Sequence, residues 1–257
     1  MTACQNPESP SFYRREGDVS SALPPNLPVP SLLGRYDDGD WVVLVFEDVE
    51  GHQPALPWTI ASLAATLEAL DRLTEATTPC PVPGLEPVGV RLEAEFNGFR
   101  TLAAAPGADG PDRVDPALRG RLDGLASLES GWATAADGRS LLHCDLRADN
   151  LLIRSDATVV VDDWPFAAVG APWVDVLFML PSVALDGGPS PDAVIDVLDP
   201  FAAVAEEAVD RVLAAITGFF VYRGTLPDPP GLPTVRAFQR AQGAVATHWL
   251  LRRLGSL

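Results

Sequence analysis

The sequence predicts an α+β protein in which a small β region precedes a mainly helical remainder. Apolar runs at residues 32–36 and 41–47 flank Asp-Asp-Gly-Asp, and Asp-Gly between such runs is a strong hairpin signal. Later segments repeat apolar residues every three or four positions, which is typical of amphipathic helices. Apart from a second short hairpin, the remainder of the chain is therefore expected to be mainly helical.

Local signals predict where the helices begin. Thr59 caps a stripe that runs from Ile60 to Leu73, and Asp115 before Pro116 begins another helix. Further helices are expected at residues 11–23, 172–185, 199–223 and 234–254, with a short one beginning at Ser190. The apolar face of the final helix is expected to comprise Phe238, Ala241, Val245 and Trp249.

Composition limits the classes of function. The chain has 257 residues and a formal net charge of −17, which argues against a general nucleic-acid binder but suits a cationic substrate. Three isolated cysteines, no cationic leader and no apolar run long enough to span a bilayer predict a cytoplasmic protein that does not bind a membrane. All 18 basic residues are arginine, so the chain contains no lysine.

One stretch, residues 141–164, carries the polar residues that suggest chemistry. An apolar pair leads into a loop with His143, Asp145 and Asn150, and two short apolar runs joined by a turn follow. Such runs predict a tight hairpin, which ends on Asp162 and Asp163. The hairpin would return these two acids to the loop.

These residue types suit phosphoryl transfer. The spacing His143-x-Asp145-Leu146-x-x-x-Asn150 fits a kinase catalytic loop except that Cys144 replaces arginine. Asp145 has the position of the base, and Asn150 and Asp163 would be magnesium ligands. Asp162 competes with Asp163 for the metal, whereas Arg147 is expected to be only a loop charge.

The same stretch resembles the aminoglycoside phosphotransferase and choline kinase-like family of small-molecule kinases. The resemblance rests on the loop motif, on Trp164 directly after Asp163, and on the segment Gly-Ala-Pro-Trp-Val-Asp that ends at Asp175. It implies a protein-kinase-like fold with a shortened β-lobe at residues 1–51 and a helical lobe at 52–257.

The resemblance also implies an activity and a set of roles. It implies transfer of the γ-phosphate of ATP, with Mg²⁺, to a hydroxyl of a small molecule such as an aminoglycoside. His143 and Asp175 would shape the loop. The adenine would meet the hinge, which comprises Glu47, Asp48 and Val49.

Two features of the family are missing, which leaves alternatives. Nothing before residue 40 resembles its Gly-rich loop, and no strand lysine can pair with Glu16, which is expected to be an orphaned or solvated helix residue. The chain could therefore be a non-catalytic scaffold or a truncated fragment. A metal-dependent hydrolase built on His143 and the nearby acids is a third hypothesis. The unpaired edge of the hairpin also predicts self-association.

Overall fold

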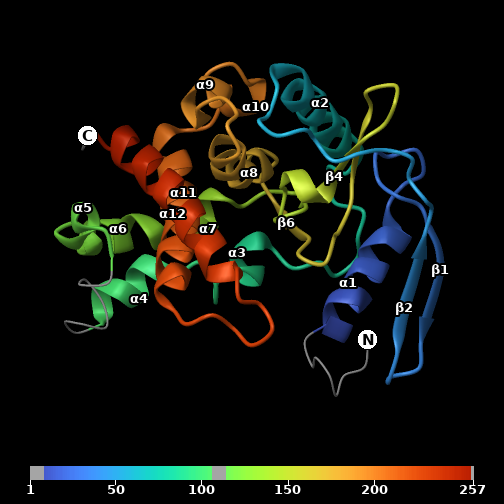
Figure 1. Ribbon diagram of the computed structural model, residues 1–257, viewed down its shortest axis with the longest axis horizontal. Helices are drawn as coiled ribbons and strands as arrows, with labels where there is room; N and C mark the ends of the chain where they lie inside the picture. Colours follow the sequence, from blue (N-terminus) through green and yellow to red (C-terminus); the bar gives the residue numbers. More distant parts are fainter. Residues whose placement is uncertain (1–8, 106–113, 256–257) are drawn as a thin grey trace. The chain divides into compact units, whose positions relative to one another are not determined.

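The computed structural model describes residues 9–105 and 114–255, and it confirms the predicted α+β composition. Two compact units share the chain (Figure 1). Unit 1 comprises Met1–Glu86, Gly138–Met179 and Asp186–Gly188, whereas unit 2 comprises Pro87–Asp137, Leu180–Leu185 and Pro189–Leu257. The lobe boundary expected at residue 51 falls inside unit 1 and stays a prediction.

Unit 1 contains all the described strands. Its elements are α1 (Ser9–Ala22), β1 (Leu32–Asp37), β2 (Val42–Phe46), α2 (Ile60–Ala76), β3 (Ser140–Leu142), the 3-10 helix η3 (Ala148–Asn150), β4 (Leu151–Ile153), β5 (Val159–Val161), β6 (Ala168–Gly170) and the first half of α8 (Trp173–Leu185). The strands form three antiparallel pairs, β1–β2, β3–β6 and β4–β5. Thr59 caps α2 as predicted, in a reciprocal pair of hydrogen bonds with Ser62.

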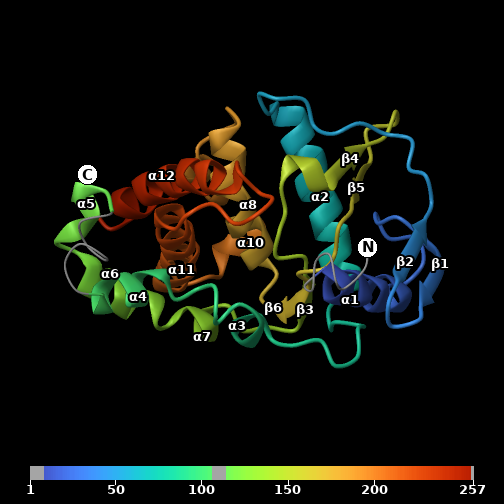
Figure 2. The same cartoon turned by 60° about the horizontal axis from the view of Figure 1, so that its bottom comes forward.

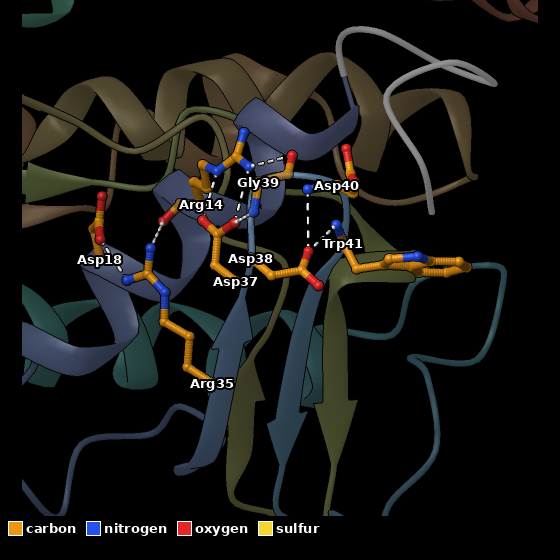
Figure 3. A network of polar contacts seen from close by, with 8 residues as sticks. All are labelled: Arg14, Asp18, Arg35, Asp37, Asp38, Gly39, Asp40 and Trp41. Atoms are coloured by element: carbon orange, nitrogen blue, oxygen red, sulfur yellow. Dashed lines mark hydrogen bonds and ion pairs between the residues drawn. The ribbon is translucent and has the colours of Figure 1, made fainter.

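Helix α1 lies against the β1–β2 hairpin, and ion pairs join the two (Figure 3). The Arg14 guanidinium donates to both carboxylate oxygens of Asp37, at 2.7 and 3.0 Å, and Arg35 donates to Asp18 at 2.5 Å. The Arg14 hydrogen bond lowers the pKa of Asp37 to about 2. Val42 is buried on this side of the hairpin. These contacts join α1 to the sheet.

The turn of the hairpin follows the prediction from its Asp-Gly sequence. Gly39 takes a positive φ of 93°, which glycine adopts without steric cost. The Asp38 carboxylate accepts hydrogen bonds from the backbone N–H groups of Asp40 and Trp41, at 3.1 and 2.8 Å (Figure 3). Local side-chain chemistry thus closes the turn.

Unit 2 is helical and is organised around α11. Its elements are α3 (Val88–Arg91), α4 (Gly98–Ala104), α5 (Pro116–Arg119), α6 (Leu122–Glu129), α7 (Trp132–Ala135), the second half of α8, α9 (Pro191–Ile195), α10 (Asp199–Ala202), α11 (Glu206–Thr225) and α12 (Val235–Arg253). Helix α11 packs along α12 and also contacts α4, α6 and α7 (Figure 2). None of the helices in the described ranges is long and apolar enough to cross a membrane.

Two helix predictions in unit 2 were wrong. The helix expected from residue 199 to 223 is interrupted after α10, because α11 begins anew at Glu206 with Ala205 as its N-cap. In α12, Phe238 is 38% exposed, while Arg236, Gln239 and Gln242 are buried. Arg236 and Gln239 can be buried because Arg236 donates to the Gln239 side chain at 2.6 Å and to the carbonyl of Pro227 at 3.1 Å.

A buried carboxylate joins α6 to α4. Glu129 accepts hydrogen bonds from the backbone N–H groups of Phe99 and Arg100, both at 2.9 Å, and from the Arg100 side chain at 3.2 Å. The first turn of α4 approaches α11 so closely that a Cβ added at Gly98 would overlap the carbonyl of Gly218. Glycine is therefore required at this crossing for steric reasons.

Replacing Gly98 by alanine should lower the free energy of unfolding by about 1–3 kcal/mol, because the backbone of α4 or α11 must shift to admit the methyl group. Gly124→Ala is the matched control, since its site inside α6 has open space around the new Cβ. That substitution should stabilise the protein by about 0.5–1 kcal/mol. Urea unfolding measures the free energy of unfolding of both variants. Equal changes in the two would contradict the close approach of α4 to α11 at Gly98.

Candidate functional site

The loop after β3 is held by a carboxylate from the first turn of α8. Asp175 is buried, and its two oxygens accept hydrogen bonds from the backbone N–H groups of His143 and Cys144, at 2.7 and 2.8 Å. Burial raises the pKa of Asp175 to about 6, and the two N–H donors oppose that rise. Cys144 takes a positive φ of 67°, an uncommon conformation that this carboxylate helps to hold.

His143 connects the loop to the end of the β4–β5 hairpin. Its Nε2 donates to the carbonyl of Asp162 at 2.8 Å, and its Nδ1 accepts from the backbone N–H of Asp145 at 3.1 Å. The ring packs edge-on against Trp164, with ring centroids 4.8 Å apart. Burial lowers the pKa of His143 to about 4, so the imidazole is neutral at pH 7. With both nitrogens engaged, the geometry suits positioning rather than proton transfer.

Asp145 follows in a half-buried position and forms an ion pair. Arg147 donates through Nη1 to Asp145 Oδ1 at 2.6 Å. Burial raises the pKa of Asp145 to about 6, and the charge and hydrogen bond of Arg147 limit that rise. Arg147 also donates through Nε and Nη2 to the two oxygens of Asp149, at 3.0 and 2.9 Å. The arginine is thus more than the plain loop charge expected from the sequence.

Asn150 directly precedes β4, and Asp163 follows shortly after β5. The backbone N–H of Asp162 donates to the carbonyl of Asn150 at 3.0 Å, which joins the two ends of the hairpin. The Asn150 side-chain nitrogen donates to the carbonyl of Asp145 at 2.7 Å, so its amide oxygen is the atom offered to a cation. Burial and the charge of Asp162 raise the pKa of Asp163.

Asp162 and Asp163 differ in what their side chains do. The Asp162 carboxylate accepts the backbone N–H of Asp163 at 2.9 Å, and Asp163 itself has a positive φ of 66°. Asp162 is therefore used within the turn, which favours Asp163 as the metal ligand of the two.

The donor set fits Mg²⁺. A carboxylate and an amide oxygen are hard ligands, and Mg²⁺ takes a few of these together with phosphate oxygens and water. Within residues 9–105 and 114–255, no group of three or more His, Cys, Asp or Glu side chains is placed to hold a metal ion.

The structure corrects the sequence interpretation of Glu16. This residue of α1 is only 8% exposed, so it is not a solvated helix residue. Burial and the charges of Asp163 and Asp162 raise its pKa to about 7, and the backbone N–H of Trp164 opposes the rise. A single acidic residue in a polar helix gives no sequence signal for this burial.

The predicted hinge, from Glu47 to Val49, runs toward β4. The backbone N–H of Glu47 donates to Ser31 at 2.9 Å, and its carboxylate accepts from Arg154 at 3.1 Å. Two backbone hydrogen bonds then join His52 to Ile153, at 3.0 and 2.8 Å. Because the Glu47 side chain is paired, only backbone groups of this segment suit an adenine edge, and that role stays a prediction.

The chain matches one family of known proteins. The model of the phosphotransferase enzyme family matches residues 4–206. No curated protein matches the chain significantly.

Solved structures give the fold. The apo form of a thermostable mutant of aminoglycoside phosphotransferase APH(4)-Ia superimposes with a TM-score of 0.59 at 13% identity, over 96% of this chain and 83% of that one. A choline/ethanolamine kinase family protein from Mesorhizobium loti gives 0.59 at 15% identity, over 95% and 83%. An aminoglycoside phosphotransferase from Alicyclobacillus acidocaldarius gives 0.56 at 16%, over 95% and 81%. At these identities the likeness shows the fold, which is protein-kinase-like as predicted.

Asp175→Ala should destabilise the protein by about 2–5 kcal/mol, because the backbone N–H groups of His143 and Cys144 lose the carboxylate that accepts their hydrogen bonds. Each unsatisfied donor costs about 1–3 kcal/mol. Chemical denaturation measures the change. Asp196→Ala, at an exposed carboxylate at the end of α9, is the control and should stay within about 0.5 kcal/mol of the parent. Equal stability of the two variants would show that Asp175 does not hold the loop.

Proposed function

The chain belongs to the phosphotransferase enzyme family, and from this premise we propose that it transfers the γ-phosphate of ATP to a hydroxyl group of a small molecule. The observation that carries the proposal is a pair of short hydrogen bonds within one loop and hairpin. The Asn150 side chain donates to the carbonyl of Asp145, and the carbonyl of Asn150 accepts from Asp162, the residue directly before Asp163. Asp145, Asn150 and Asp163 are the residue types that phosphoryl transfer needs for a base and for metal ligands.

Asp145 would act on the acceptor. Its pKa of about 6 leaves the carboxylate mostly ionised at pH 7, yet close enough to neutrality to take a proton from a hydroxyl as the reaction proceeds. The backbone N–H of Asp145 is held by His143, so the side chain starts from a fixed place in the loop. Orientation of the hydroxyl is then the main contribution of this residue.

Asn150 and Asp163 would hold Mg²⁺ against the nucleotide phosphates. When bound, the ion would offset the negative charge of the phosphates. Asp163 provides a carboxylate and Asn150 a neutral oxygen, so the protein contributes one unit of negative charge through these two ligands. That modest charge leaves the ion with most of its attraction for phosphate.

The acceptor that we propose is a cationic small molecule with a free hydroxyl. One related structure is a ternary complex of APH(4)-Ia with AMP-PNP and hygromycin B, and another relative is named as a choline/ethanolamine kinase family protein. A cationic nitrogen, as an amine or a quaternary ammonium, is common to these acceptor classes. The net charge of −17 on this chain would concentrate such a cation near the protein.

A non-catalytic scaffold is the second candidate, and the missing lysine favours it. Removing one preorganised donor to a charged transition state typically costs on the order of 10²–10³ in turnover. Such a protein would bind nucleotide without transferring phosphate. The retention of Asp145 beside both metal ligands supports the catalytic proposal, because a scaffold needs no base.

Calorimetric titration with ATP tests the metal ligands. The parent chain should bind ATP more tightly with Mg²⁺ than without, and Asp163→Asn should lose about tenfold or more of the Mg²⁺-dependent affinity. Asp162→Asn is the matched control, since an asparagine oxygen can still accept the N–H of Asp163. Loss of affinity in the Asp162 variant alone would transfer the metal role to that residue.

The fall of activity at acid pH should report the ionisation of Asp145. Because the ionised form accepts the proton and its pKa is about 6, kcat/KM for an amino alcohol or aminoglycoside acceptor should rise between pH 5 and 6.5 and level off above about pH 7. Nucleotide binding measured over the same pH range distinguishes the ionisation of ATP from that of Asp145. Asp145→Asn should lower kcat by about 10²–10⁴ and bind nucleotide normally. An unchanged kcat would remove Asp145 from the mechanism.

A further inference from the structure

We propose that Arg147 binds the phosphoryl group in transfer and supplies the positive charge that this lysine-free chain cannot take from a lysine. The inference rests on the proposed function and extends it to a residue that the loop motif leaves unassigned. It is carried by the position of the Arg147 guanidinium, between Asp145 and Asp149.

The guanidinium is held at one place by two carboxylates. Asp149 accepts from Nε and Nη2 in a fork, which fixes the plane of the group, and Asp145 accepts from Nη1 at 2.6 Å. The Arg147 side chain is 28% exposed, so it is reachable from solvent but largely shielded by protein. A fixed, partly desolvated arginine exerts more electrostatic force than an exposed one.

Distance limits place this charge beside the reaction. An acceptor hydroxyl oriented by Asp145 must lie about 2.6–3.2 Å from its carboxylate. The reacting phosphorus must lie about 3–3.5 Å from that hydroxyl. If the hydroxyl uses Oδ1, the oxygen that accepts from Nη1 at 2.6 Å, the phosphorus lies at most about 9 Å from that nitrogen. Exchange of the Asp145 contact for a phosphoryl oxygen, with the fork to Asp149 kept, would bring the two groups together.

The charge balance of the site calls for such a cation. Four aspartates, at positions 145, 149, 162 and 163, already lie in this loop and hairpin. The charge of Arg147 acts on the carboxylates of Asp145, Asp149 and Asp163, so it lies central to them. A bound triphosphate would add further negative charge that one Mg²⁺ only partly offsets. Arg147 is positioned to offset the rest.

Asp149 would be a positioning residue for the arginine. Its carboxylate is 56% exposed and accepts both hydrogen bonds of the fork from Arg147. Without the fork, the guanidinium would keep its charge but lose its fixed plane. We therefore expect a smaller effect from Asp149→Asn than from loss of the arginine itself.

The test compares the affinity for Mg²⁺–AMP-PNP with that for Mg²⁺–ADP, measured by calorimetry on the full chain. AMP-PNP keeps the third phosphate unit and is not turned over. Arg147→Gln should weaken AMP-PNP binding by about tenfold or more and ADP binding by less than about twofold. Arg147→Lys should restore most of the AMP-PNP affinity, which a purely structural role for the guanidinium fork would not allow. Arg211→Gln removes an exposed arginine from α11 as the control and should change neither affinity.

The possible outcomes separate the two proposals. Equal weakening of both nucleotides, or no weakening, would overturn the role of Arg147 and leave the proposed function standing. Failure of the parent chain to bind either nucleotide would overturn both. If thermal unfolding shows that Arg147→Gln does not fold, Asp149→Asn replaces it. A preference for AMP-PNP over ADP that falls in that variant supports the inference, and an unchanged preference overturns it.

Discussion

The carboxylate of Asp175 is the contact on which the arrangement of the site depends. It fixes the backbone of His143 and Cys144, and His143 then uses both ring nitrogens to hold Asp145 and the end of the hairpin. Each later contact builds on the one before it, because the part of the loop between β3 and η3 has no regular secondary structure of its own. Removing the first acceptor would release the loop and leave the strands around it paired.

The site retains conformations and charges that cost stability. Cys144 and Asp163 both have positive φ values, of 67° and 66°, which for non-glycine residues are held only where surrounding contacts enforce them. Burial raises the pKa of Asp145, Asp163 and Asp175, so each ionised carboxylate is less stable in the fold than in water. Such costs gather where a protein binds or reacts, because an optimally stable arrangement would have no reason to keep them.

The sequence predicted those features that local chemistry decides. The Asp-Gly turn, the Thr59 cap and the hairpin after Asn150 each depend on residues within a few positions of one another. The features that the sequence interpretation missed or had wrong concern partners distant in sequence. The polar face of α12, the burial of Glu129 against α4 and the burial of Glu16 beside the hairpin require tertiary contacts that no periodic pattern reveals. The fork between Arg147 and Asp149 is an intermediate case. The two residues are close in sequence, but the geometry of their hydrogen bonds depends on the loop that Asp175 holds.

The absence of lysine changes how this site can balance its charges. Glu16 points toward Asp162 and Asp163 in a chain with no lysine to pair with, and its pKa of about 7 means that near neutral pH a large fraction of it carries no charge. A protonated Glu16 avoids repulsion with its acidic neighbours, so it can remain buried without a cationic partner. The positive charge of the site is thereby concentrated on Arg147, in the same loop as the residue that would orient the acceptor. A lysine on a separate strand would hold the phosphates from outside the loop. An arginine within the loop depends instead on the Asp175 carboxylate, the same contact that positions Asp145.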